Sequence, residues 1–151
     1  MAKKIFIICP VRKPKRSKIS ELYHKIINKT KKQKEYHEIV QEKIEAYIKG
    51  LKSVGHQVHW PPIDTDQNDP IGIKICDTNL KKIEEADEVH VWYELTSTGS
   101  HFDLGGAYML IRILSYDKVV KIINYDEVKN KCEDSKSFYK VLLFLHKDTN
   151  K

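Results

Sequence analysis

The sequence has no apolar run that approaches the roughly 20 residues a helix needs to cross a bilayer, so we expect no membrane span and no membrane partner. Its N-terminal apolar stretch covers residues 5–9, which is too short for the core of a signal peptide. We interpret that stretch as part of a first strand. These two absences together predict a cytoplasmic protein.

Cysteine is scarce, and the three that occur, Cys9, Cys76 and Cys132, lie far apart. An odd count argues against a disulfide framework, and the lack of CxxC or Cys/His spacing argues against zinc. The segment from residue 64 superficially resembles a calcium loop, but it has Asp69 where such a loop needs glycine and Ile75 where it needs glutamate. We therefore expect reduced, mostly buried thiols and no metal.

The common nucleotide-binding signatures are also missing. The sequence contains neither a Walker A motif nor G-x-G-x-x-G. ATP hydrolysis and dinucleotide redox chemistry are therefore not expected, and we predict no organic cofactor.

Acidic residues are nearly absent from one segment of the chain. Between Arg12 and Lys34, ten Lys or Arg residues stand against one acid, Glu21, and the whole chain carries a formal net charge of +6. Such a segment can attract phosphates or nucleic acid. It holds one aromatic residue, Tyr23, so it lacks the interleaved aromatics of a base-stacking surface. We interpret it first as a solvated loop and helix start, with nucleic-acid association as the alternative.

The chain of 151 residues, 40% of them hydrophobic, has the length of one domain, which we place at 1–151. Runs of β-branched residues predict strands covered on both faces, and apolar residues repeating every three or four positions predict amphipathic helices. Gly55 is expected to end the first helix, and Asp69 to cap the second with Pro70 in its first position. We expect strands at 3–9, 56–60, 87–93 and 118–123, and helices at 33–54, 70–85, 101–115 and 135–146.

This alternation of strands and helices predicts an α/β fold: three layers, α/β/α, around a parallel sheet of four to five strands. Ligands of such sheets bind at the carboxyl ends of the strands, where the strand order reverses. The candidate site loops are those that follow strands, at 10–18, 61–69, 94–101 and 124–126.

The stretch STGSHFDLGGA at 97–107 is the most informative of these regions. Ser97, Gly99 and Ser100 precede a predicted helix, and free backbone N–H groups at a helix start bind anions. Gly99 would let a phosphate approach the backbone closely, and the serine hydroxyls would donate to it. Alternatively, Ser100 only caps the helix, and Asp103 completes something like a capping box.

Other side chains near the predicted strand ends are also candidate site residues, and a purely structural role is the alternative for them. Arg12 closely follows the first strand, and its planar guanidinium suits a phosphate, although it could be one surface arginine among many. Trp92, Tyr93 and His101 could stack on a base, and Trp92 could equally pack in the core. Glu94 ends the third strand and could bind sugar hydroxyls or act as an acid, or it could be a solvated carboxylate.

The stretch at 97–107 resembles the signature of the nucleoside 2-deoxyribosyltransferase superfamily. It is most similar to the branch containing the 2'-deoxynucleoside 5'-phosphate N-hydrolases, which reads approximately Ser-x-Gly-x-Gly-aromatic-Glu-Leu-Gly-x-Ala. The matching residues are Ser97, Gly99, Phe102, Leu104, Gly105 and Ala107. The stretch CPVR at 9–12 resembles the branch's Ser-Ile-Arg, and NLKKIEEADEVHV at 79–91 resembles its Asp-Leu helix and following strand through Leu80, Ala86 and Asp87.

The resemblance implies a flavodoxin- or Rossmann-like fold and cleavage of the N-glycosidic bond of a nucleoside 5'-monophosphate, with hydrolysis favoured over transfer. No metal or organic cofactor is needed for that chemistry, and family members are typically dimers or higher oligomers. Asp103 stands where the family has a nucleophilic glutamate, and Asn79 stands where it has a supporting aspartate. Ser100 and His101 replace a glycine-containing pair before the aromatic residue.

Our leading hypothesis combines this resemblance with the positions of the candidate residues and assigns each of them a binding role. Phosphate would be bound near Pro10 by Arg12, Ser97, Gly99 and Ser100. Glu94 or Asn79 would orient the sugar or the base, and Trp92 or Tyr93 would stack on the base. Because Asp103 is one methylene shorter than glutamate and Asn79 cannot shuttle a proton, a non-catalytic nucleotide-binding module is the second hypothesis, and a nucleic-acid-associated protein is the third.

Overall fold

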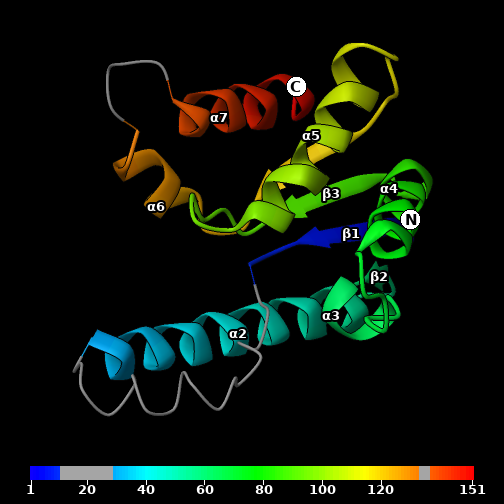
Figure 1. Ribbon diagram of the computed structural model, residues 1–151. Coiled ribbons are helices and arrows are strands. Elements are labelled where there is room, and N and C mark those ends of the chain that lie inside the picture. Colours follow the sequence, from blue (N-terminus) through cyan, green and yellow to red (C-terminus); the bar gives the residue numbers. More distant parts are fainter. Residues whose placement is uncertain (11–28, 133–136) are drawn as a thin grey trace.

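The computed structural model describes residues 1–10, 29–132 and 137–151, and it confirms the three-layer α/β fold (Figure 1). Four parallel strands form one sheet in the order β2-β1-β3-β4. The strands are β1 (Lys4–Ile8), β2 (Gln57–His59), β3 (Glu88–Val91) and β4 (Val119–Ile122). The chain runs from β1 outward to β2 and then returns past β1 to β3, so the strand order reverses between β1 and β3. That reversal is where open parallel sheets bind ligands.

One face of the sheet is covered by the long helix α2 (Lys29–Ser53). Successive side chains of a strand point to opposite faces, so Ile5 and Ile7 of β1 both point toward this helix. There they pack with Val40, Ile44 and Ile48 in a buried cluster, hereafter the α2-side core. Gly55 follows α2 with a φ of 90°, a left-handed conformation that glycine adopts without steric cost, as predicted for a residue that ends this helix.

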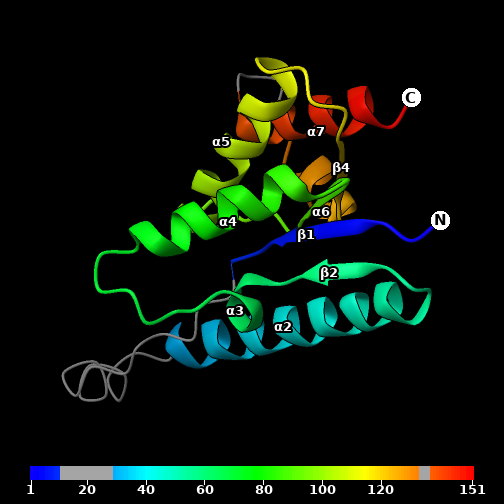
Figure 2. The same cartoon turned by 90° about the vertical axis from the view of Figure 1, so that its right-hand side faces the viewer.

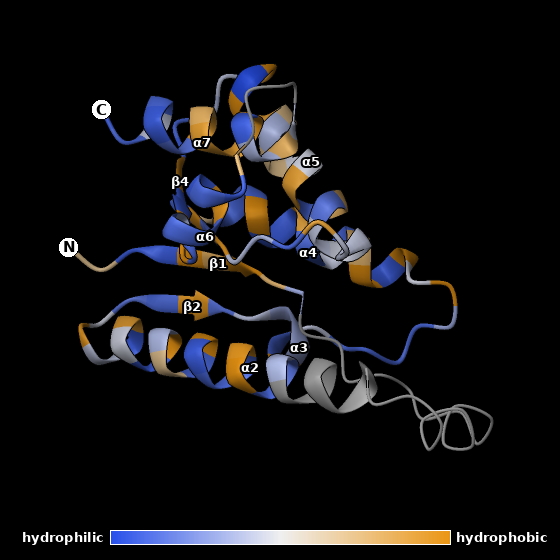
Figure 3. Ribbon diagram, turned by 90° about the vertical axis from the view of Figure 1, so that its left-hand side faces the viewer, coloured by the Kyte–Doolittle hydropathy of each residue, from blue (hydrophilic) through white to orange (hydrophobic). Residues whose placement is uncertain are grey.

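The opposite face carries the larger core. Phe6 and Ile8 of β1 and Val89 and Val91 of β3 point into it. Three helices cover them: α4 (Ile73–Glu85), α5 (Thr98–Arg112) and α7 (Phe138–Thr149). Figure 2 shows α2 on one side of the sheet and these helices on the other, with both chain termini at the same end of the molecule. In Figure 3 the hydrophobic part of β1 lies between the two helical layers.

The predicted start of α4 at Pro70 is wrong, because the helix begins at Ile73. The turn before it uses Gly72 at a φ of 94° as the residue preceding the helix. Asp69 nevertheless caps the helix from a distance. Its Oδ2 accepts the backbone N–H groups of Lys74, at 2.7 Å, and Ile75, at 3.3 Å, which have no partner within the first turn.

The start of α5 differs from the prediction in the opposite direction, because this helix begins at Thr98, before the predicted His101. Ser97 is its capping residue, and the Ser97 Oγ accepts the backbone N–H of Ser100 at 3.4 Å. The alternative in which Ser100 caps the helix is therefore wrong. Ser97 and Ser100 are three residues apart, which is the spacing of an N-cap side chain and the residue whose backbone N–H donates to it, but serine is a common cap and the sequence allowed either serine to be the cap. Gly99 and Ser100 lie in the first helical turn.

Two short helices lie in segments that were expected to be loops, α3 (Pro61–Asp64) and α6 (Tyr125–Asn130). Pro61 and Pro62 occupy the first turn of α3, where proline is tolerated because its missing N–H has no helical partner to lose. Asp64 accepts the backbone N–H of Trp60 at 2.7 Å and closes that turn. Among the helices of the described residues, none is long and apolar enough to cross a membrane.

Candidate functional site

A cavity of about 220 Å³ opens at the carboxyl ends of β1 and β3, at the predicted reversal of strand order. Its walls come from the end of β1, from α3 and the loop after it, from α4, and from the first turns of α5. The lining residues are Ile7, Cys9, Pro10, Pro61, Pro62, Gln67, Ile75, Asn79, Thr96, Ser97, Thr98, Gly99, Ser100 and Asp103. Six of the eleven candidates from the sequence are among them.

Asp103 and Asn79 meet in this cavity although they are 24 positions apart in the chain. Asp103, on α5, is 9% exposed, and Asn79, on α4, is 5% exposed. The Asn79 Nδ2 donates to the Asp103 Oδ2 at 3.2 Å and lies 3.5 Å from its Oδ1. An ionised carboxylate only accepts hydrogen bonds, so the amide stabilises Asp103 in its charged form.

The orientation of the Asn79 amide is fixed from its other side. The Thr65 hydroxyl, 4% exposed, donates to the Asn79 Oδ1 at 2.9 Å. The amide oxygen thus faces a donor and the amide nitrogen faces an acceptor, which leaves one assignment of the two atoms. Thr65 was not predicted from the sequence, but it lies in the loop after β2, which the strand-end rule marks as a candidate.

Close packing of α4 on α5 brings these two side chains together. A Cβ at Gly106 would lie 2.1 Å from the Leu80 Cδ2, so the present Leu80 rotamer depends on glycine there. Leu80 is the neighbour of Asn79, and Gly106 is one turn after Asp103. By contrast, a Cβ at Gly105 would meet nothing within 4 Å.

The first turn of α5 forms the polar wall of the cavity. The Oγ atoms of Ser97 and Ser100 are 2.8 Å apart, and both residues line the cavity with Thr98 and Gly99. The first N–H groups of a helix have no acceptor within it, and the helix dipole places partial positive charge there. A helix start of this kind is suited to an anionic ligand group, which is the role that the sequence predicts for Ser97, Gly99 and Ser100.

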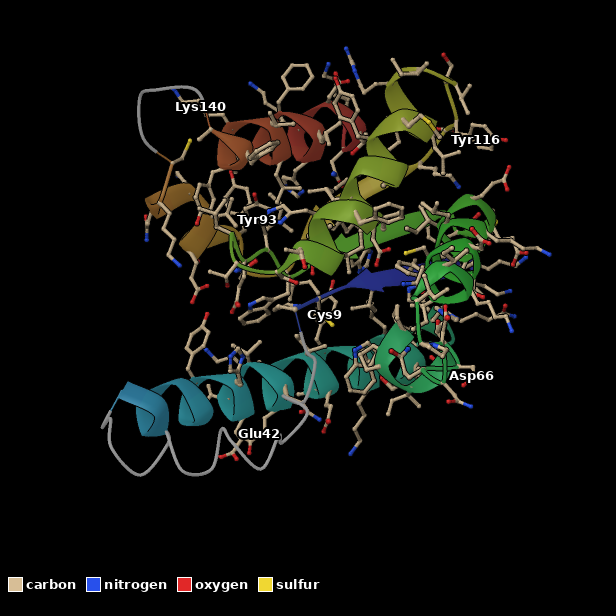
Figure 4. The ribbon with its side chains drawn as sticks, viewed as in Figure 1. Cys9, Glu42, Asp66, Tyr93, Tyr116 and Lys140 are labelled. Atoms are coloured by element: carbon tan, nitrogen blue, oxygen red, sulfur yellow. The ribbon has the colours of Figure 1, made fainter. Side chains whose placement is uncertain are left out.

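Tyr93 and His101 are not brought to the cavity. The His101 Nε2 lies 3.1 Å from the Tyr93 hydroxyl, and the Tyr93 ring meets Tyr139 of α7 edge-on at 5.2 Å. Burial raises the pKa of Tyr93 to about 12. Figure 4 shows Tyr93 on the α7 side of the sheet and Cys9 on the α2 side. These two of the three predicted stacking residues thus pack against α7 instead of lining the cavity.

Trp92 and Glu94 point to the opposite face from Tyr93 but also do not line the cavity. Trp92 is 5% exposed and packs in the α2-side core. Of the two roles that the sequence allowed, base stacking and core packing, the structure shows core packing. Among the residues that the structure describes, none is a hydrogen-bond partner of the buried Trp92 Nε1 or of the buried Glu94 Oε1. Pro10 lines the cavity as expected, whereas Arg12 and most of the basic segment lie outside the described residues.

Cys9 also lines the cavity, at the end of β1, and its Sγ accepts a hydrogen bond from the Trp60 Nε1 at 3.3 Å. None of the three cysteines forms a disulfide. In the part of the chain that the structure describes, no group of three or more His, Cys, Asp or Glu side chains is placed to hold a metal ion.

A second cluster of charges lies at the other end of the sheet, away from the cavity. The Glu88 side chain is 3% exposed and accepts hydrogen bonds from Lys3 and from the Lys121 Nζ at 2.8 Å, and it pairs with the His90 Nε2 at 2.7 Å. Burial opposes ionisation of Glu88, but these hydrogen bonds outweigh burial and lower its pKa to about 2. Burial is also the main cause that lowers the pKa of His90. The cluster links residues of β3 and β4 with Lys3, which directly precedes β1.

Comparisons of the chain with protein-family models, with curated proteins and with solved structures return no match. The site must therefore be interpreted from its own groups. These are a buried carboxylate held by an amide, two hydroxyls, and the first turn of a helix, in one cavity at the sheet reversal.

Proposed function

We propose that this protein binds a nucleoside 5'-monophosphate and hydrolyses its N-glycosidic bond, with Asp103 as the nucleophile, in the manner of the nucleoside 2-deoxyribosyltransferase-like class that its motifs resemble. One observation carries the proposal. The Asp103–Asn79 pair and the first turn of α5 line one cavity at the reversal of the sheet. A carboxylate and an anion-binding helix start are the two groups that this reaction needs.

The proposed chemistry has two steps. The Asp103 carboxylate attacks the anomeric carbon from about 3 Å while the carbon–nitrogen bond breaks, and the base leaves with the bonding electrons. A sugar ester of Asp103 forms and is then hydrolysed by water. Asn79 orients the carboxylate but has no proton to give, so the leaving base takes its proton from water. A base that leaves readily as an anion would be favoured for this reason.

The sugar phosphate would sit on the wall formed by Ser97, Gly99 and Ser100. The N-terminal end of α5 supplies partial positive charge, and the serine hydroxyls supply donors. Arg12 would add its guanidinium from the segment that follows β1. This arrangement selects a nucleotide over an uncharged nucleoside.

The second candidate is a nucleotide-binding module without catalysis. Its support is Asn79 itself, which replaces a group able to move a proton and instead holds Asp103 on one side. Binding without turnover would leave the anion wall and the carboxylate in use as contacts for phosphate and sugar.

We also propose that the protein is cytoplasmic and that it forms a homo-oligomer. Helices α5 and α7 expose large apolar side chains, among them Phe102, Ile113, Phe138 and Phe144. Exposed apolar surface of this kind is typical of protein contacts. Light scattering coupled to size-exclusion chromatography would test for a dimer or larger assembly.

Incubation with a panel of ribo- and deoxynucleoside 5'-monophosphates, followed by chromatography of the free bases, tests the function. We expect base release by the natural protein and a loss of at least about 10³-fold in Asp103→Asn, which keeps the shape but not the charge. Asp77→Asn on the exposed side of α4 is the matched control and should be fully active. Nucleotide binding without base release would favour the module, and neither binding nor release would contradict both.

A further inference from the structure

A chain of three hydrogen bonds leads from β2 to the candidate nucleophile. The His59 Nε2 lies 2.9 Å from the Thr65 Oγ1, the Thr65 hydroxyl donates to the Asn79 Oδ1 at 2.9 Å, and the Asn79 Nδ2 donates to Asp103. Thr65, Asn79 and Asp103 are all buried. The chain thus connects the sheet edge, the loop after β2, α4 and α5 by side-chain contacts alone.

The single hydroxyl hydrogen of Thr65 determines the direction in which hydrogen bonds are donated along this series. Thr65 has a single hydroxyl hydrogen, and that hydrogen is used toward the Asn79 Oδ1. The Thr65 oxygen can therefore only accept from His59, so His59 must carry its hydrogen on Nε2. Every donor in the chain then points toward the Asp103 carboxylate, which is the terminal acceptor.

The protein holds both outer members of the chain in place. The His59 ring stacks on Phe6 of β1, with 5.3 Å between centroids and 13° between planes. The Thr65 backbone N–H donates to the Pro61 carbonyl at 3.1 Å, which ends α3 and sets the Thr65 side chain beneath the cavity wall.

The chain also keeps its direction over a wide pH range. Burial lowers the pKa of His59, an effect that Lys82 reinforces and that Asp64 and Glu85 oppose. A neutral His59 with hydrogen on Nε2 and a charged His59 both donate from that atom. Titration of His59 therefore does not reverse the chain.

We propose that His59 and Thr65 are positioning residues that act on Asp103 through Asn79. They hold the Asn79 amide in the single orientation in which its N–H groups face the carboxylate, and so keep Asp103 an ionised acceptor in the cavity. The proposal rests on the proposed function, because it assigns the purpose of the chain to the Asp103 nucleophile. If the chain had only a structural role, its loss would change stability and leave turnover as it is.

Two pairs of variants test the positioning role in the nucleotide assay. Thr65→Val keeps the shape of threonine without its hydroxyl, and Thr65→Ser restores the hydroxyl. We expect Thr65→Val to lower kcat by about 10- to 100-fold with KM within about threefold, and Thr65→Ser to recover most of kcat. His59→Gln should retain function because its amide nitrogen can donate to Thr65, whereas His59→Leu should behave as Thr65→Val. Circular dichroism identifies any variant that fails to fold. If a variant of one pair fails to fold, the kcat values of the other pair test the proposal.

A substrate-independent measurement separates this proposal from the proposed function. In ¹⁵N-labelled protein, the imidazole shifts of His59 report which nitrogen bears hydrogen, and the side-chain amide signals of Asn79 report its orientation. We expect hydrogen on the His59 Nε2, and Asn79 amide signals that move or broaden in Thr65→Val but not in Thr65→Ser. If the natural protein releases no base, the proposed function fails and these signals alone decide whether the chain holds Asn79. Hydrogen on the His59 Nδ1 but not on its Nε2 at neutral pH, unchanged Asn79 signals in Thr65→Val, or an unchanged kcat in Thr65→Val would each overturn the proposal.

Discussion

Each end of the sheet holds a buried carboxylate, and the surroundings of the two carboxylates differ. At the carboxyl ends, Asp103 is held by Asn79 inside a cavity with room for a ligand. At the amino ends, Glu88 is surrounded by Lys3, Lys121 and His90. We assign the first carboxylate to the proposed chemistry and the second to stability.

The Glu88 cluster makes stability depend on pH in a defined direction. The pKa of Glu88 is about 2 in the folded protein and 4.5 in its ordinary state. A lowered carboxyl pKa contributes stability that is present above pH 4.5 and is lost as the pH falls toward 2. The contribution at pH 7 is on the order of 3 kcal/mol. His90 acts in the same direction, because its lowered pKa disfavours the folded state when the pH falls below its ordinary value.

Glu88→Gln should therefore be less stable than the natural protein at pH 7, by up to about 3 kcal/mol in urea unfolding, and the gap should narrow steadily toward pH 3. Glu85→Gln is the control, because Glu85 is an exposed partner of Lys82 and should leave the unfolding curve nearly unchanged. A gap between Glu88→Gln and the natural protein that stays constant with pH would show that Glu88 does not contribute through its charge.

At the scale of elements, the proposed site depends on the packing of helix α4 against helix α5. They carry Asn79 and Asp103, and glycine at position 106 permits their close approach. The GG pair in α5 offers a matched comparison, because both positions gain the same helix propensity on substitution by alanine, up to about 1 kcal/mol. The two positions differ only in what the new methyl group meets.

We expect Gly105→Ala to leave stability unchanged or raise it slightly, since the added Cβ meets open space. Gly106→Ala should be less stable than Gly105→Ala by about 1 to 3 kcal/mol, since Leu80 must leave its rotamer or the helices must separate. Base release should fall in Gly106→Ala and persist in Gly105→Ala. Equal melting temperatures for the two variants would contradict the role of Gly106 in helix packing.

Elements were predictable from the sequence wherever a periodic pattern was long. The apolar positions of α2 and the β-branched residues of β1 and β3 predicted those elements, because burial on one face or on both leaves a repeat. Helix starts were less predictable. Asp69 and Ser97 are both capping residues in the structure. Asp69 caps α4 across a turn at Gly72, and α5 is capped by Ser97, whereas the sequence also allowed Ser100 as its cap. Capping depends on backbone torsions that residue spacing alone does not determine.

At the scale of the whole molecule, the topology gathers distant segments at one end of the sheet. Residues from four separate parts of the chain, among them Pro10, Thr65, Asn79 and Asp103, lie in or beside one cavity. The rule that ligands bind at strand ends predicted this place. It could not predict that Tyr93 faces α7 while Trp92 packs on α2, because the direction of a side chain after a strand depends on which helical layer it meets.

A covalent bond between Asp103 and the sugar is detected most directly by mass spectrometry after rapid acid quench of the protein with a nucleotide that it cleaves. We expect a burst of free base equal to the protein, and a peptide containing Asp103 that is heavier by the mass of the sugar phosphate less one water. Both signals should be absent in Asp103→Asn. Base release by Asp103→Asn at the natural rate, with no modified peptide in the natural protein, would contradict the account.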